Sequence, residues 1–178
     1  MKFIYILFQK LKIICMFLLQ MFCIYFKQID PSIKIEIPFK TTRESAGFDI
    51  CVPELKEPIC IMPDQKYKIF TNVKYEITDI SKNEYSMYLD LTGKSSNFKK
   101  NLFVYRGIMD KDYTGEISVF VKNESCTDIL VLNSFEPIAQ LVPILLPCIG
   151  TNARIVDIER GDAGEGIMTK LYKEKFHE

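Results

Sequence analysis

Asp110 and Tyr113 stand in a polar turn, residues 107–116, directly before a stretch of alternating residues. That stretch places apolar side chains on one side: Ile117, Val119 and Val121. A period of two predicts a strand with one buried face. A carboxylate at the start of a rigid strand can orient and deprotonate a water molecule, and a ring beside it can lie against a flat or apolar ligand group. A structural Asp-rich β-turn is the alternative.

A second polar group, Gly93-Lys94-Ser95-Ser96, follows a predicted strand over residues 85–91. Exposed backbone N–H groups at a glycine, an ammonium and two hydroxyls together suit anionic oxygens. The segment is not a P-loop, because the upstream glycine and the four-residue spacer are missing. A plain polar turn remains the alternative.

Two further polar residues lie beside predicted strands. Asp49 precedes the strand 50–52 and follows Ala46 and Gly47, which let the backbone pass close to a neighbour. Gln140 interrupts the apolar run 138–142. A buried amide needs hydrogen-bond partners, so Gln140 is either satisfied within the core or points at a ligand.

Composition favours one all-β domain, a sandwich or barrel, in a chain of 178 residues with zero net charge. Zero net charge with interspersed charges argues against a nucleic-acid partner. Six cysteines without a C-x-x-C pair, and His177 as the single histidine, favour neither zinc nor a disulfide framework. We expect reduced, mostly buried thiols and a cytoplasmic or nuclear location. Further strands are predicted over residues 30–38, 66–77 with a break near Asn72, 128–132, 137–147 and 154–158.

Residues 1–26 differ from the rest because they are almost entirely apolar. Their clean run, 13–26, has 14 residues, fewer than the roughly 20 needed to span a bilayer. We predict a helix with a narrow polar stripe, which would lie on a membrane or pack against the domain or a neighbouring subunit. A start at Met21, with a spurious upstream extension, is the alternative. The expected division is an extension 1–28, a β domain 29–158 and a Gly-containing arm 159–178.

Taken in order, five segments resemble the motifs of the trimeric dUTP diphosphatase (dUTPase) family over about residues 29–169. They are Ser45-Ala46-Gly47-Phe48-Asp49-Ile50, Gly93-Lys94-Ser95-Ser96, Gly107-Ile108-Met109-Asp110 with Tyr113 and Gly115, Ile138-Ala139-Gln140-Leu141, and Arg160-Gly161 through Gly166. The resemblance implies a jelly-roll β-barrel (β-clip) that forms a homotrimer with active sites between subunits. It also implies Mg2+-assisted hydrolysis of dUTP to dUMP and pyrophosphate, which limits uracil in DNA and supplies dUMP for thymidylate synthesis.

The resemblance also implies a role for each matching residue. Asp110, Asp49 and Gln140 would be the catalytic group: Asp110 would orient the attacking water and Asp49 would reach magnesium through water. The nucleoside would contact Val104, Gly107, Asp110 and Tyr113, with uracil recognised by backbone groups. The phosphates would contact Lys94, Ser95, Ser96, Gln140, Arg160, Gly164 and Gly166, the last three in an arm that closes as a lid.

Several positions depart from the family pattern. Lys94 stands where the family has Arg and cannot offer the bidentate guanidinium fork. Tyr105 and Arg106 could crowd the uracil pocket. In the arm, Glu165 replaces a Phe that stacks over uracil and Ile167 replaces a Ser. We therefore expect a weakened lid and slow turnover.

Two alternatives to an active dUTPase stay open. One is a protein of the same fold with weakened or lost catalysis that binds nucleotides or another protein. The other is a dCTP deaminase, but that branch needs Glu ten residues after the motif-three Asp, where this chain has Phe120.

Overall fold

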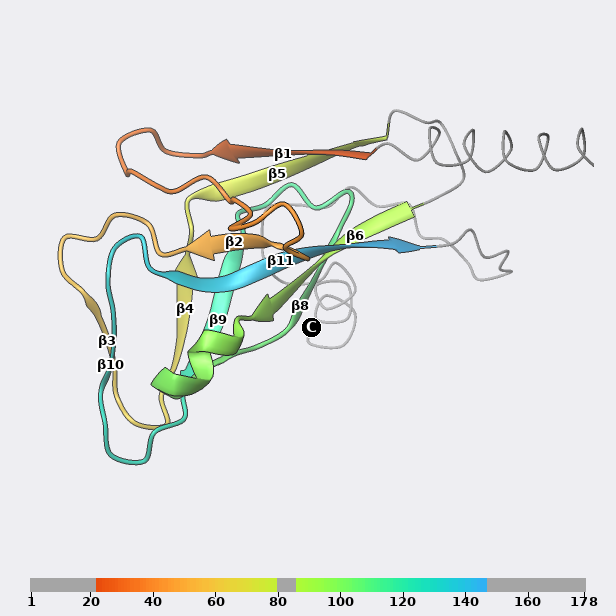
Figure 1. The fold of residues 1–178 in the computed structure, drawn as a ribbon. Coiled ribbons are helices and arrows are strands. Elements are labelled where there is room, and N and C mark those ends of the chain that lie inside the picture. Colours follow the sequence, from red (N-terminus) through yellow and green to blue (C-terminus); the bar gives the residue numbers. More distant parts are fainter. Residues whose placement is uncertain (1–21, 80–85, 147–178) are drawn as a thin grey trace, which may run out of the picture.

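The computed structural model describes residues 22–79 and 86–146, whose regular secondary structure is almost entirely β-strand (Figure 1). The strands are β1 (Phe22–Gln28), β2 (Phe48–Cys51), β3 (Ile59–Ile61), β4 (Lys66–Phe70), β5 (Val73–Asp79), β6 (Ser86–Gly93), β7 (Leu102–Val104), β8 (Gly107–Asp110), β9 (Ser118–Asn123), β10 (Leu130–Leu132) and β11 (Pro137–Leu146). One short 3-10 helix, η1 (Ser95–Lys100), follows β6. The all-β expectation is confirmed.

The described strands form four antiparallel sheets. A four-stranded sheet has the order β2-β11-β6-β8, a three-stranded sheet has the order β4-β9-β7, and β1-β5 and β3-β10 are pairs. Neighbours in space are often distant in sequence, as where β11 lies between β2 and β6. This order brings three segments that carry predicted site residues to one sheet.

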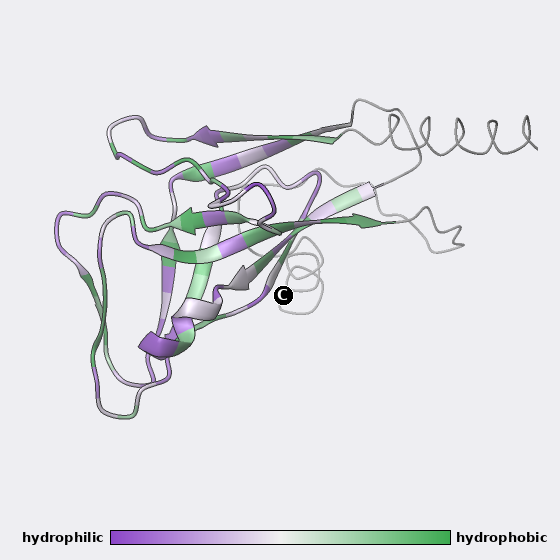
Figure 2. Cartoon of the chain, viewed as in Figure 1, coloured by the Kyte–Doolittle hydropathy of each residue, from purple (hydrophilic) through white to green (hydrophobic). Residues whose placement is uncertain are grey.

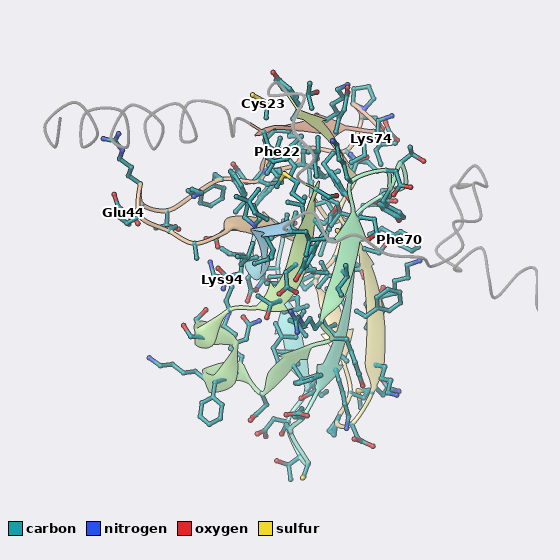
Figure 3. The ribbon with its side chains drawn as sticks, turned by 90° about the vertical axis from the view of Figure 1, so that its right-hand side faces the viewer. Phe22, Cys23, Glu44, Phe70, Lys74 and Lys94 are labelled. Atoms are coloured by element: carbon teal, nitrogen blue, oxygen red, sulfur yellow. The ribbon has the colours of Figure 1, made fainter. Side chains whose placement is uncertain are left out.

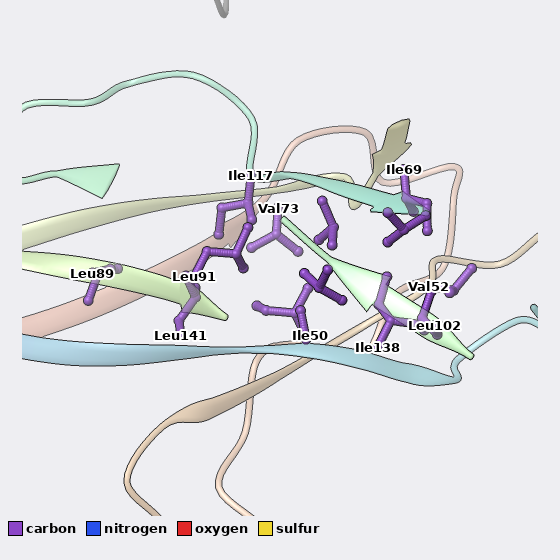
Figure 4. Packing of buried hydrophobic residues seen from close by; sticks show 14 of the residues in the cluster. Ile50, Val52, Ile69, Val73, Leu89, Leu91, Leu102, Ile117, Ile138 and Leu141 are labelled. Atoms are coloured by element: carbon purple, nitrogen blue, oxygen red, sulfur yellow. The ribbon is translucent and has the colours of Figure 1, made fainter. Parts of the chain in front are cut away.

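The core lies between the sheets and consists of the inward side chains of alternating strands. Figure 4 shows Ile50, Ile138 and Leu141 of β2 and β11 facing Ile117, Val73 and Ile69. Ile117, Val119 and Val121 are fully buried, as their alternation predicts. Figure 2 shows the same alternation as changes of hydropathy along the strands, while η1 is largely hydrophilic. Burial of these branched side chains is the main stabilising term.

Strand β1 corrects the N-terminal prediction. Residues 22–28 are not helical and do not lie outside the domain: they pair with β5 from Phe22↔Asp79 to Gln28↔Val73. Phe22, Ile24 and Phe26 pack against the core, while Tyr25 and Lys27 point outward. Periodicity alone cannot assign a short run that is apolar on both faces to helix or strand. Here pairing with β5 makes it a strand. The prediction for residues 1–21 lies outside the described residues.

The strand predicted over residues 30–38 is also wrong. Residues 31–33 form a turn, and Ile33 and Ile37 are exposed. Side-chain amides hydrogen-bond to a backbone acceptor here: Gln28 Nε2 and Asn72 Nδ2 donate to the Ile33 carbonyl oxygen at 2.7 and 3.1 Å. Side chains that take a backbone acceptor compete with a strand ladder.

The break predicted near Asn72 is confirmed, since Asn72 has φ 59° between β4 and β5. The expected burial of the thiols is wrong in part: all four described cysteines are free, but only Cys51 is buried, while Cys60 and Cys126 are exposed. Within 22–79 and 86–146, no helix is long and apolar enough to cross a membrane. The predicted strand 154–158 and arm 159–178 lie outside the described residues.

Candidate active site

Asp49 and Lys94 meet in space although they are 45 residues apart. Lys94 Nζ lies 2.5 Å from Asp49 Oδ2, and Thr41 Oγ1 donates to the same oxygen at 3.0 Å. The two charged side chains are 10% and 22% exposed for Asp49 and Lys94. A partly desolvated carboxylate is stabilised by such charge-assisted hydrogen bonds. Lys94 is therefore tied to Asp49 in the isolated chain, and an incoming anion would compete for its ammonium.

Gln140 lies beside this ion pair through strand register. It is opposite Asp49 on β2 and opposite Thr92 on β6. Directly opposed residues project to the same face of a sheet, so the Asp49, Gln140 and Thr92 side chains share the outer face, away from the buried Ile50, Ala139 and Leu141. The Gln140 side chain therefore lies outside the apolar core, and contact with a ligand stays a prediction.

Ser95 and Ser96 are the first two residues of η1, directly after Lys94, and each carries a side-chain hydroxyl. Buried Asn97 anchors this turn because its Nδ2 donates to the Ile138 carbonyl of β11 at 2.6 Å. The anchor holds the Lys94–Ser96 turn against the strand that carries Gln140. Motifs one, two and four are thus adjacent in this chain.

Gly47 explains why a glycine precedes Asp49. A Cβ at this position would lie 2.7 Å from the Leu141 carbonyl oxygen and 3.0 Å from Val142 Cγ2. The backbone before β2 therefore passes β11 too closely for any side chain.

Asp110 and Tyr113 lie at a second place, a hollow of about 290 Å³ between the β7–β8 turn and the β4–β9 pair. Tyr105, Arg106 and Gly107 also line it. The Val104 side chain is buried in the core and does not line the hollow, so a ligand could contact Val104 only through its backbone, the kind of contact that the resemblance implies for uracil.

Two tyrosines fix the position of Asp110. The Tyr75 hydroxyl donates to the Asp110 carbonyl oxygen at 2.6 Å, and the Tyr113 N–H donates to the same oxygen at 3.1 Å. The Tyr113 hydroxyl donates to the Glu116 carbonyl at 2.9 Å. Its ring leaves no room for a side chain at Gly115, where a Cβ would lie 2.6 Å from the hydroxyl.

The β7–β8 turn is held by an ion pair. Arg106 donates through Nε and Nη2 to the two carboxylate oxygens of Asp90, both at 2.8 Å. Asp90 raises the pKa of Arg106 through these hydrogen bonds. The Arg106 guanidinium is thus held against Asp90 of β6, while Arg106 also lines the hollow, so crowding of the pocket stays a prediction.

The two polar groups are well separated within one chain. Gln140 is opposite Thr92 on β6, whereas Asp110 is opposite Tyr88. About 3.4 Å per residue and about 4.8 Å per strand place Asp49 and Asp110 on the order of 20 Å apart. Figure 3 likewise shows Lys94 and Phe70, which borders the hollow, on opposite sides of the molecule. One metal–phosphate group, with metal–oxygen distances of about 2 Å, cannot meet both carboxylates of one chain.

The residues fit magnesium only as a weakly held ion. Among the described residues, no three His, Cys, Asp or Glu side chains converge as a metal site. Asp49 offers one carboxylate, and Mg2+ is often held by one or two carboxylates with waters and substrate phosphates completing its shell. Asp49 therefore suits contact through water.

Sequence reasoning missed several residues of these groups. Three of them make hydrogen bonds to other segments that no local sequence pattern predicts: Thr41 to Asp49, Tyr75 to the Asp110 carbonyl, and Asn97 to the Ile138 carbonyl. Lys68, Phe70 and Phe120 line the hollow. Their signal was available in part, because Lys66, Lys68 and Phe70 alternate with Ile69, which is buried. Arg160, Gly164 and Gly166 lie outside the described residues.

Comparisons with known proteins identify the family and the fold. The sequence profile of the dUTPase family matches residues 33–168. The chain belongs to the dUTPase family. Its fold is shared with EIAV dUTPase, at a TM-score of 0.54 and 28% identity over 78% of this chain and 99% of that one. The dUTPase of Staphylococcus bacteriophage 80alpha superposes with a TM-score of 0.57 at 21% identity, over 79% and 99% of the two chains.

Viral polyproteins contain related segments. The chain is 34% identical over 140 residues to the Pol polyprotein of equine infectious anemia virus, and 41% identical over 82 residues to the Gag-Pro polyprotein of mouse mammary tumor virus. These matches cover 76% and 46% of this chain, but the chain spans only 11% and 9% of the two polyproteins. The matched segment is a small part of each polyprotein.

Proposed function

We propose that this dUTPase-family chain hydrolyses dUTP to dUMP and pyrophosphate by attack of water on the α-phosphorus. The observation that carries the proposal is the hollow of about 290 Å³ bordered by Asp110 and Tyr113, together with a separate polar group. We refer to that second group as the proposed anion-binding group; it consists of Asp49, Lys94, Ser95, Ser96 and Gln140. Such an activity would limit uracil in DNA and supply dUMP for thymidylate synthesis.

At the hollow, the carboxylate of Asp110 accepts a proton from the attacking water and contacts the sugar 3′-hydroxyl. Tyr75 and Tyr113 hold its backbone, so the main chain that carries the carboxylate is already in place when the substrate binds. The Tyr113 ring lies against the deoxyribose and leaves no room for a 2′-hydroxyl. Backbone groups near Gly107 recognise uracil.

At the anion-binding group, Lys94, the two serines of η1 and Gln140 bind phosphate oxygens. Lys94 Nζ, which lies 2.5 Å from Asp49 Oδ2, would exchange the Asp49 carboxylate for a phosphate oxygen. The Asp49 carboxylate would then be available to hold magnesium through water. When bound, Mg2+ neutralises phosphate charge and orients the leaving group. Lys94 supplies charge without a bidentate fork, so we propose looser phosphate alignment than arginine would give.

The separation of the two groups supports a homotrimer with active sites between subunits. Asp110 of one copy would complete the site formed by Asp49, Lys94 and Gln140 of its neighbour, because one chain holds them on the order of 20 Å apart. Arg160, Gly164 and Gly166 of the arm would close over the phosphates, with Glu165 weakening that closure through its charge.

The test is release of pyrophosphate from dUTP by the purified full-length chain, with UTP, dTTP and dCTP in parallel, first with magnesium and then with EDTA. We expect magnesium-dependent cleavage of dUTP alone. An Asp110→Asn variant, which keeps size and hydrogen bonding but not the base, should lose activity while staying folded and trimeric. A folded wild-type trimer without pyrophosphate release would overturn the proposal and favour a binding role for the same fold.

A further inference from the structure

Three side chains that the proposed mechanism does not use line the same hollow as Asp110 and Tyr113. They are Lys68 and Phe70 on β4 and Phe120 on β9, and we refer to them as the β4–β9 wall. Strand register places Lys68 directly opposite Phe120, and Phe70 directly opposite Ser118. Alternation places all three on the outer face of the three-stranded sheet, since Ile69 and Val119 between them are buried.

The rings of the wall are open to a ligand. Phe70 is 55% exposed and Phe120 is 50% exposed. Figure 3 shows Phe70 pointing away from the body of the molecule. An exposed ring on its own needs no explanation. Two such rings bordering one concave site, next to a positioned carboxylate, form the flat apolar surface on which a planar ring can stack.

The Lys68 ammonium completes the wall. Its Nζ lies 4.4 Å from the ring centroid of Phe70 and 5.4 Å from that of Phe120. These cation–π contacts hold the ammonium over the rings rather than in free solvent. An ammonium has three N–H donors and no acceptor, so a carbonyl oxygen at the edge of a ligand is favoured here and an amino group is opposed.

We propose that the β4–β9 wall is a base-contacting subsite of the hollow: Phe70 and Phe120 stack against the pyrimidine, and Lys68 selects for a carbonyl oxygen at its edge. This inference rests on the proposed function for the identity of the base. It adds specificity residues from β4 and β9 to the backbone recognition near Gly107. Uracil carries two carbonyl oxygens, whereas cytosine replaces one by an amino group, so Lys68 discriminates between them.

The test measures binding of dUMP by isothermal titration calorimetry, because dUMP carries the base and is not cleaved. We expect Phe70→Ala to raise the Kd for dUMP about tenfold, since base–aromatic stacking commonly contributes that much. The Kd for pyrophosphate should not change, because the wall does not contact phosphate. The matched control is Phe98→Ala, which removes a ring that is 89% exposed on η1 and does not line the hollow; it should leave the Kd for dUMP unchanged.

Lys68→Met tests the selection for a carbonyl, since it removes the charge and keeps a long apolar side chain. The preference for dUMP over dCMP should fall about tenfold, as expected for a lost hydrogen bond to a charged donor. Equal Kd values for dUMP in wild type and Phe70→Ala would refute stacking. A shift in trimer mass in Phe70→Ala, or equal weakening of pyrophosphate, would also overturn the subsite, because the rings would then serve assembly or folding.

The failure of this proposal can be told from failure of the proposed function. A wild-type chain that binds dUMP but does not cleave dUTP would contradict only the hydrolysis, and the Phe70→Ala comparison would still decide the wall. Cleavage of dUTP with no effect of either wall variant would contradict only the wall. A wild-type chain that neither binds dUMP nor cleaves dUTP would overturn both.

Discussion

Gly47 offers a sharp test of how closely β2 and β11 are packed. In Gly47→Ala, the new Cβ would lie 2.7 Å from the Leu141 carbonyl oxygen, whereas ordinary carbon–oxygen contacts begin near about 3.3 Å. The strands would have to separate by several tenths of an ångström. Overpacking costs about 1–3 kcal/mol, and we expect the upper half of that range, about 2–3 kcal/mol, because the clash is with backbone.

Thermal unfolding followed by circular dichroism measures this cost at a fixed protein concentration. A loss of about 2–3 kcal/mol should lower Tm by about 4–12 °C in a chain of this size. The separation would also move Asp49 away from Gln140, so dUTP hydrolysis should decline together with Tm.

Gly107→Ala is the matched control for stability. It lies on β8 of the same sheet, but its Cβ would meet only Leu91 side-chain atoms at 3.8 Å, an ordinary contact. Neither glycine has a positive φ. The control should be neutral or gain up to about 1 kcal/mol, because alanine restricts the unfolded chain. Equal destabilisation by the two substitutions would refute the close approach as the cause.

Three further predictions concern single side chains. Tyr75→Phe removes the 2.6 Å hydrogen bond to the Asp110 carbonyl, so it should lower the free energy of unfolding in urea by about 1 kcal/mol. It should also lower kcat more than it changes KM, because Tyr75 holds the backbone of Asp110. An unchanged kcat would contradict this positioning role of Tyr75. Asn72→Ala should lower the free energy of unfolding by about 2–3 kcal/mol, because it loses the side-chain hydrogen bonds to the Asp30 and Ile33 carbonyls and must hold alanine at φ 59°. Asn72→Gly loses the same hydrogen bonds without that backbone strain, so it should cost about 1 kcal/mol less. An equal cost of the two substitutions would refute the backbone contribution. Burial raises the pKa of the Cys51 thiol to about 11, so the thiol ionises at lower pH in the unfolded chain than in the folded one. Relative to Cys51→Ala, the wild type should keep its full free energy of unfolding below about pH 8.5 and lose up to about 2 kcal/mol as pH rises to about 11. Free energies of unfolding in urea that change equally with pH in the two proteins would refute the shift.

Much of the fold followed from local pattern. Alternation in residues 85–91 and 117–121 identified strands with one buried face. The β-rich composition of residues 66–77 indicated a further strand region, with a break near Asn72 that separates β4 from β5. The order of five motifs identified the family, because the glycines, carboxylates and hydroxyls of each motif, and their spacing, can be read directly from the sequence. The local signal failed where both faces of a segment were apolar, as in β1, and where alternation existed without a free partner, as in residues 33–37.

Contacts between distant segments were decided by the tertiary structure alone. Lys94 meets Asp49, Tyr75 meets the Asp110 backbone, and Lys68 lies over Phe120, because antiparallel pairing brought together strands that are far apart in sequence. The side-chain pattern of a strand fixes which face is buried, but not which strand it will pair with. The sequence by itself therefore determined the residues that can do the chemistry, and the register of the sheets determined which of them meet within one chain.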